Sequence, residues 1–180
     1  INMATNTALI GQGDGTTLFL QSGSYSGNMA MISAINVTDV EISNLRMNGN
    51  DVGASVGFGM GIQFRNVSSS TVSYVHAYDQ VDTAIFLEQG SNGNRIVGNT
   101  AIDSFKPIYL SDNADYNIVT GNYMSEGGNA GMNIESSSSY NIITNNIINL
   151  NEGYGVRFQF GTNVENIISD NVITNNGGSG

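Results

Sequence analysis

The chain has 180 residues, 39% of them hydrophobic, which is enough for one domain with a packed core. Only 11% of the residues are charged, which excludes a coiled coil or a charge-rich helical bundle. The net charge of −10 argues against a nucleic-acid partner, because phosphate binding needs clustered Lys and Arg. Cysteine is absent, which excludes a disulfide framework and fits an extracellular or cell-surface protein. No apolar run predicts membrane insertion.

Asparagine and glycine dominate the composition, with 26 and 23 residues, whereas proline occurs once. Both residue types tolerate the left-handed backbone conformation that tight corners require. The apolar residues come in short β-branched runs, and no long stretch has a period of 3.6. The composition therefore predicts many short strands joined by corners.

The first such corner lies in residues 7–18, where a short apolar run leads into Gly11, Gly13 and Gly15. This glycine spacing is found in nucleotide-binding loops, but those need a helix to follow directly. No helical pattern follows here, so we interpret the glycines as a tight corner between strands.

A five-residue strand pattern then recurs along the chain. It consists of a small residue or proline followed by alternating apolar and variable positions, and its first residues are Gly61, Ala84, Pro107, Gly131 and Gly155. The steps between them are 23, 23, 24 and 24 residues. A fixed period of this length is typical of a solenoid.

A second pattern keeps the same phase, with an Asn after an apolar run. Its members are Asn44, Asn99, Asn122, Asn146 and Asn171, with Tyr74 at the equivalent place in one copy. We expect these amides to stack as a ladder inside one corner, each bonding its neighbours in the next turns. The one long step predicts a loop inserted at 49–60.

The fold class predicted by these repeats is all-β, a right-handed parallel β-helix of about six turns of 23–25 residues, in a single domain 1–180. A leucine-rich repeat would need a fixed Leu ladder, which is absent. Alternation along the strands places the following side chains inside: Ile62, Phe64, Ile85, Leu87, Ile108, Leu110, Met132, Ile134, Val156 and Phe158.

Residues 7–18 resemble the first complete turn of the pectate-lyase-like superfamily, which often carries a Leu-Ile-Gly-x-Gly-x-Gly-x-Thr signature there. The later Asn-x-Ile-x-x-Asn repeats are similar to those of alginate C5-epimerases and NosD-like β-helix proteins. The resemblance implies the β-helix fold and a functional surface on the strand that carries the first pattern. It does not imply one activity, because this scaffold hosts many.

Two columns of side chains are expected on the outside of that strand. One contains Gln63, Phe86, Tyr109, Asn133 and Arg157, and the next contains Arg65, Glu88, Ser111, Glu135 and Gln159. Aromatic rings beside amides, cations and carboxylates suit sugar rings and their hydroxyls, so the columns predict polysaccharide binding. An ordinary polar strand surface is the alternative.

Catalysis would rest on Glu88 and Glu135, which share a column two turns apart, about 10 Å by strand spacing, as an inverting hydrolase could use. A polyuronate lyase or epimerase would also need a cation, from Arg65, Lys106 or Arg157. The epimerase catalytic run does not carry over, because Phe86 occupies its Asp position and Glu88 its His position.

No cofactor is predicted. Calcium could bind acidic pairs at Asp79 and Asp82 or at Asp112 and Asp115, but no known calcium-loop spacing supports it, which favours solvated loop acids. The single histidine, His76, is more typical of packing than of ligation.

Residues 175–180 match the phase that precedes Gly155, and no cap is evident at either end. This predicts either a fragment of a longer solenoid or an uncapped module. The leading hypothesis is an extracellular β-helix module that binds polysaccharide, without assured catalysis. The alternatives are a structural protein that self-associates end to end, such as a surface filament or tail fibre, and a polyuronate lyase or C5-epimerase.

Overall fold

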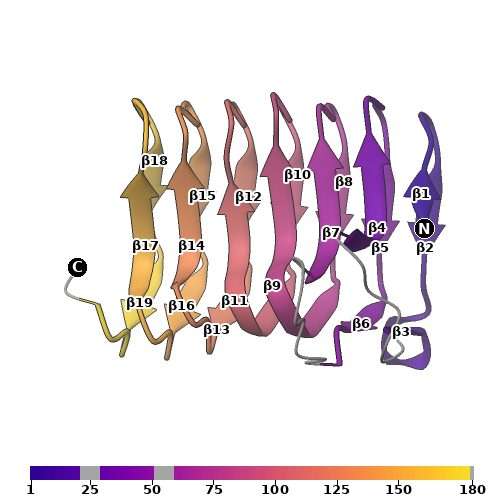
Figure 1. The fold of residues 1–180 in the computed structure, drawn as a ribbon, viewed down its shortest axis with the longest axis horizontal. Coiled ribbons are helices and arrows are strands. Elements are labelled where there is room, and N and C mark those ends of the chain that lie inside the picture. The colour runs from indigo at the N-terminus through magenta and orange to yellow at the C-terminus, as the bar shows by residue number, and fades with distance from the viewer. Residues whose placement is uncertain (21–28, 51–58, 179–180) are drawn as a thin grey trace.

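A computed structural model describes residues 1–20, 29–50 and 59–178. The chain forms a right-handed parallel β-helix, in which short strands of successive turns stack along one long axis (Figure 1). Every pair of neighbouring strands in this part of the chain is parallel, and the ladders of hydrogen bonds join each turn only to the turns before and after it. The single helical segment in the described residues is a short 3-10 turn, η1 (Gly13–Gly15).

Each turn contributes strands to three faces. Face 1 consists of β1 (Asn2–Met3), β4 (Met29–Ile35), β7 (Gly59–Arg65), the later part of β9 (His76–Glu88), the later part of β11 (Thr100–Leu110), β14 (Ala130–Glu135) and β17 (Tyr154–Gln159). Face 2 consists of β2 (Ala8–Ile10), β5 (Glu41–Ser43), β8 (Thr71–Ser73), β10 (Arg95–Val97), β12 (Ile118–Thr120), β15 (Ile142–Thr144) and β18 (Ile167–Ser169). Face 3 consists of β3 (Thr17–Phe19), β6 (Arg46–Asn48), the early parts of β9 and β11, β13 (Tyr123–Ser125), β16 (Ile147–Asn149) and β19 (Val172–Thr174).

The strand register follows the sequence period. Ile62 of β7 pairs with Ile85 of β9, Ile85 pairs with Ile108 of β11, and Ile108 pairs with Met132 of β14. Stacked strands lie about 4.8 Å apart, so each inward side chain packs on its equivalent in the next turn. The period read from the sequence is therefore the period of the coil.

The core forms as alternation predicts, with one difference in the last turn. Eight of the ten side chains expected inside are fully buried, whereas Val156 is half-buried and Phe158 is 45% exposed. Within the described residues no later strand pairs with β17, so nothing covers these two side chains.

An asparagine ladder runs inside the corner between faces 2 and 3. The side-chain amide of Asn99 donates to Oδ1 of Asn122 at 3.0 Å, Asn122 donates to Asn146 at 3.0 Å, and Asn146 donates to Asn171 at 2.9 Å. The same amides also donate to backbone carbonyls, such as that of Ile96. Buried corner backbone groups are thereby satisfied without water.

Asn44 does not belong to this ladder, which corrects the prediction. It is exposed with φ 54°, while the next residue, Leu45, is buried at the ladder position. Tyr74, with φ 53°, precedes Val75 in the same way. The left-handed corner residue and the ladder residue are neighbours in sequence, and both positions favour Asn, so the pattern alone placed the first two copies one residue early.

A second ladder, not anticipated from the sequence, joins Asn94, Asn117, Asn141 and Asn166 at the opposite end of face 2. A third contact of this kind joins Asn151 to Asn176 at 2.8 Å. Asparagine side chains thus form hydrogen bonds between successive turns at several corners of the coil.

The loop expected at 49–60 falls largely on residues 51–58, which lie outside the described residues. Gly59 and Met60 belong to β7. In the part of the chain that the structure describes, no helix is long and apolar enough to cross a bilayer.

The ladder gives a stability prediction. Asn122→Ala removes an amide that accepts bonds from Asn99 and donates to Asn146 and to backbone, so we expect a loss of about 3 kcal/mol in the free energy of unfolding. Urea denaturation followed by circular dichroism measures it. The control is Asn145→Gly at the exposed neighbour with φ 56°, which should cost less than about 1 kcal/mol. Equal losses in the two variants would contradict the ladder's role.

Candidate functional site

The outward side chains of face 1 align in the two expected columns. Gln63 pairs in register with Phe86, Phe86 with Tyr109, and Tyr109 with Asn133. Arg65 pairs with Glu88 in the neighbouring column. The strands of face 1 are parallel and in register, so the outward side chains of successive turns lie side by side on one surface.

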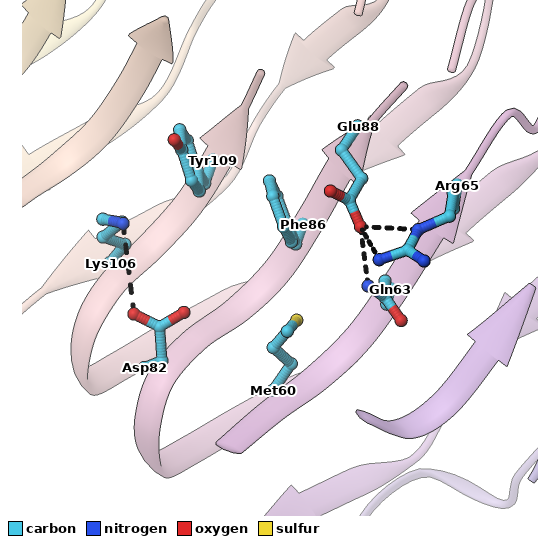
Figure 2. A pocket seen from close by; sticks show the side chains of 8 residues that line it. All are labelled: Met60, Gln63, Arg65, Asp82, Phe86, Glu88, Lys106 and Tyr109. Atoms are coloured by element: carbon cyan, nitrogen blue, oxygen red, sulfur yellow. Dashed lines mark hydrogen bonds and ion pairs between the residues drawn. The ribbon is translucent and has the colours of Figure 1, made fainter. Parts of the chain in front are cut away.

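A cavity of about 210 Å³ opens on this surface over β7, β9 and β11 (Figure 2). Its volume is below the range of about 300–1,000 Å³ typical of sites for drug-sized ligands. It therefore suits one small ring rather than a large cofactor. The cavity is lined by Met60, Gln63, Arg65, Asp82, Phe86, Glu88, Lys106 and Tyr109.

Two aromatic rings stand in the middle of the cavity lining. Phe86 and Tyr109 lie parallel, with centroids 4.6 Å apart and 5° between the planes. Stacking at the strand spacing is what the register of β9 and β11 dictates for aromatic side chains in one column. The pair gives the surface a rigid apolar element.

A charged network closes one end of the cavity. Glu88 accepts hydrogen bonds from Gln63 Nε2 at 2.6 Å and from Arg65 Nε and Nη2 at 3.0 and 2.9 Å, all at its Oε1 atom (Figure 2). The Glu88 side chain is buried, whereas that of Arg65 is 37% exposed. Several charge-assisted bonds on one oxygen hold the carboxylate in a single position.

A second ion pair lies at the other end, where β9 and β11 bend from face 3 to face 1. Lys106 Nζ lies 4.0 Å from Asp82 Oδ1 and 4.2 Å from the centroid of the Tyr109 ring. Thr83 Oγ1 donates to Asp82 Oδ2 at 2.9 Å. Burial raises the pKa of Asp82, and the nearby Lys106 ammonium offsets this in part.

The two candidate catalytic carboxylates turn to different partners. Glu88 faces Arg65 and Gln63, whereas Glu135 accepts a hydrogen bond from the Tyr109 hydroxyl at 2.8 Å. Burial is also the main reason that the pKa of Tyr109 is raised, so its hydroxyl stays protonated as a donor. Glu135 does not line the cavity. The arrangement therefore does not present both carboxylates to one bond in a shared cavity.

The remaining expected binding residues lie on face 1 outside the cavity lining. Asn133 is fully buried, and its Oδ1 atom has no partner within the described part of the chain. Arg157 donates to Asn129 at 2.8 Å. Ser111 is buried in the second column next to Glu88, and Gln159 is half-buried on the last turn of face 1.

Sequence reasoning did not anticipate how Met60, Asp82 and Lys106 complete the cavity. The sequence marks Lys106 only as a candidate cation for a uronate, and Asp82 only as a candidate calcium ligand. The register pairs Lys106 with Thr83, and the irregularity between Ser104 and Lys106 brings Lys106 next to Asp82. The sequence period predicts that Asp82 and Lys106 lie on adjacent turns. It does not predict the bend of β9 and β11 between face 3 and face 1, where the two side chains meet.

The described residues contain no group of three or more His, Cys, Asp or Glu side chains that could hold a metal ion. Asp82, one of the aspartates weighed as a calcium ligand, pairs with Lys106 and accepts a hydrogen bond from Thr83. His76 packs against Tyr78 and near Arg46, and burial followed by the Arg46 charge lowers its pKa. An adjacent cation opposes the binding of a metal ion at this imidazole.

Several solved structures share this architecture at low sequence identity. The chain is similar to the periplasmic alginate epimerase AlgG, with a TM-score of 0.66 and 15% identity over 76% of this chain and 31% of that one. It is similar to the A-module of the mannuronan C-5 epimerase AlgE4 from Azotobacter vinelandii, with a TM-score of 0.57 and 15% identity over 98% and 64%. It is also similar to the catalytic domain of a GH87 alpha-1,3-glucanase bound to tetrasaccharides, with a TM-score of 0.61 and 17% identity over 92% and 32%.

These likenesses establish the fold, and the chain spans less than two thirds of the length of each of the three proteins. A comparison of the sequence with curated proteins gives no match.

A family model described as Periplasmic copper-binding protein (NosD) matches residues 2–179. Copper sites use thiolate, thioether or imidazole donors, whereas this sequence has no Cys and one His. Of its seven methionines, Met47, Met124 and Met132 are fully buried in the apolar core, Met60 is buried in β7, Met3 and Met31 are half-buried, and Met29 is exposed. The residues that the structure describes therefore do not supply the cysteine or histidine donors of a copper site. By the extent of the match, the chain belongs to the NosD family of parallel β-helix proteins.

Proposed function

We propose that the chain binds a polysaccharide along face 1, with one sugar unit seated in the cavity over β7, β9 and β11. The observation that carries the proposal is the rigid Phe86 and Tyr109 pair, set between two networks of hydrogen-bonding groups. A pyranose ring has an apolar face and a rim of hydroxyls. It is matched by an aromatic surface with donors and acceptors around it.

The hydrogen-bonding groups lie at opposite ends of the cavity. Gln63, Arg65 and Glu88 form one end, and Asp82 and Lys106 form the other (Figure 2). Each set is held by its own internal bonds, so little side-chain entropy remains to be lost when a ligand binds. A preformed site of this kind favours recognition of a repeating ligand.

The shape of the molecule supports a polymer rather than a free sugar. The strands of face 1 stack along the long axis, so the surface continues on both sides of the cavity (Figure 1). A chain lying across the stacked strands would meet side chains at regular intervals of about 4.8 Å.

The comparisons support the same class of ligand. Alginate epimerases and an alpha-1,3-glucanase with tetrasaccharides are among the similar structures, and the family is described as periplasmic. We infer a location outside the cytoplasm, where such polymers occur. Binding, rather than turnover, is the function we propose, because Glu88 and Glu135 are each engaged by separate donors.

The aromatic pair gives the first test. We expect Tyr109→Ala to weaken polysaccharide binding about tenfold or more, because it removes one ring of the stack and the ring beside Lys106. Tyr109→Phe should bind within about threefold of the parent, since the ring remains. Affinity electrophoresis in gels containing a panel of polymers measures both.

The matched control is Tyr123→Ala, which removes a half-buried tyrosine of β13 on face 3. It should leave binding unchanged. Equal losses from Tyr109→Ala and Tyr123→Ala would contradict the assignment of the site to face 1.

The protonation of Asp82 tests the geometry of the cavity independently of any ligand. Because burial raises the pKa of Asp82 in the folded chain, the folded state takes up this proton at higher pH than the unfolded state. Acidification from about pH 7 to about pH 4.5 should therefore add stability through this group, and Asp82→Asn should lose that gain. Urea denaturation of both proteins at the two pH values measures the difference. Profiles that differ by a constant amount would show that Asp82 is not buried as described.

A further inference from the structure

We propose that the cavity selects neutral sugar units and disfavours uronates, so that the ligand is a neutral polysaccharide. This inference rests on the proposed function and adds the chemical class of the ligand. It differs from what the similarity to alginate epimerases would lead one to expect. It depends on how the charges around the cavity are paired.

Both cations that line the cavity already have a carboxylate partner. Arg65 directs two N–H groups to Glu88 Oε1, and Lys106 Nζ lies 4.0 Å from Asp82 with the Tyr109 ring on another side. A uronate carboxylate that approached either cation would also approach the carboxylate already paired with it, so repulsion from Glu88 or Asp82 would offset the attraction. Neither cation therefore offers a uronate an uncompensated positive charge.

The carboxylates themselves oppose a second anion. Glu88 and Asp82 are both buried, at 7% and 8% exposure, so water screens their charges poorly. The whole chain carries a net charge of −10, which repels a polyanion over longer distances. Unfavourable contacts of this kind discriminate against one ligand class without strengthening binding of the other.

Sugar hydroxyls face no such obstacle. A hydroxyl both donates and accepts, so it can bond to a carboxylate or a guanidinium without breaking the ion pair. Arg65 keeps 37% of its side chain exposed while bound to Glu88, so it can still donate to a hydroxyl. Phe86 is half-buried between the two ion pairs and offers its ring to the apolar side of an uncharged sugar (Figure 2).

The test compares neutral and acidic polymers on the intact chain. Affinity electrophoresis uses alpha- and beta-glucans, mannan and xylan as neutral polymers, and alginate and polygalacturonate as acidic ones, each at low and at moderate salt. We expect binding to at least one neutral polymer. Binding to the acidic polymers should be at least about tenfold weaker and should improve with salt, because salt screens repulsion.

The outcomes separate the two proposals. Tight binding of alginate or polygalacturonate that weakens as salt is added would overturn the neutral-ligand inference and leave the proposed function standing. Failure to bind any polymer would overturn the proposed function itself.

Charge variants test the cause of the selectivity. Asp82→Asn leaves Lys106 without its carboxylate, so the ratio of acidic to neutral polymer affinity should rise about tenfold. Glu165→Gln makes the same charge change at an exposed corner away from the cavity, and should leave the ratio unchanged. If Asp82→Asn does not fold, Glu88→Gln makes the equivalent change beside Arg65. An unchanged ratio in a folded cavity variant would overturn the inference.

Discussion

The stacking of parallel strands in register is the constraint on which the rest of this structure depends. Each turn lies on the next at about 4.8 Å, so every side chain meets the equivalent side chain of two other turns. Apolar positions such as Ile62, Ile85 and Ile108 then form continuous columns inside the coil. A polar side chain inside the coil must therefore form hydrogen bonds with the equivalent side chain of the next turn. Asparagine can do this because its amide has both a donor group and an acceptor.

The same constraint shapes the outer surface. Like charges stacked at this spacing would repel, whereas opposite charges and aromatic rings attract. The stacked pairs on face 1 are of these favourable kinds: Arg65 lies beside Glu88, and Phe86 lies beside Tyr109. The ion pair and the ring pair that we assign to ligand binding therefore also stabilise the stacking of the strands of face 1. Their contacts with each other hold these side chains in place before a ligand binds.

The sequence reveals the parts of the molecule that repeat. The steps of 23 and 24 residues predict the register of Gln63, Phe86, Tyr109 and Asn133, which the structure confirms. Asn44 was placed wrongly because the left-handed corner and the ladder position adjoin and both favour asparagine. The ladder from Asn94 to Asn166 was missed because its members lie within Asn-rich corners that read as turns.

The parts that do not repeat could not be predicted. The pairing of Asp82 with Lys106 depends on the bend in β9 and β11, and only these two turns have strands that run continuously from face 3 to face 1 within the described residues. The sequence period also does not predict which partner each carboxylate of face 1 bonds to. Glu88 turns to Arg65 and Glu135 to Tyr109 because of the particular donors beside them.

The proposed function requires that a sugar unit binds over Phe86 in the cavity of face 1. A crystal structure of the chain with a neutral oligosaccharide that it binds tests this most directly. We expect a sugar ring packed on Phe86, with hydroxyls bonded to the Arg65 and Glu88 pair and the ion pairs intact. A ligand bound on face 2 or face 3, with the cavity containing only solvent, would contradict it.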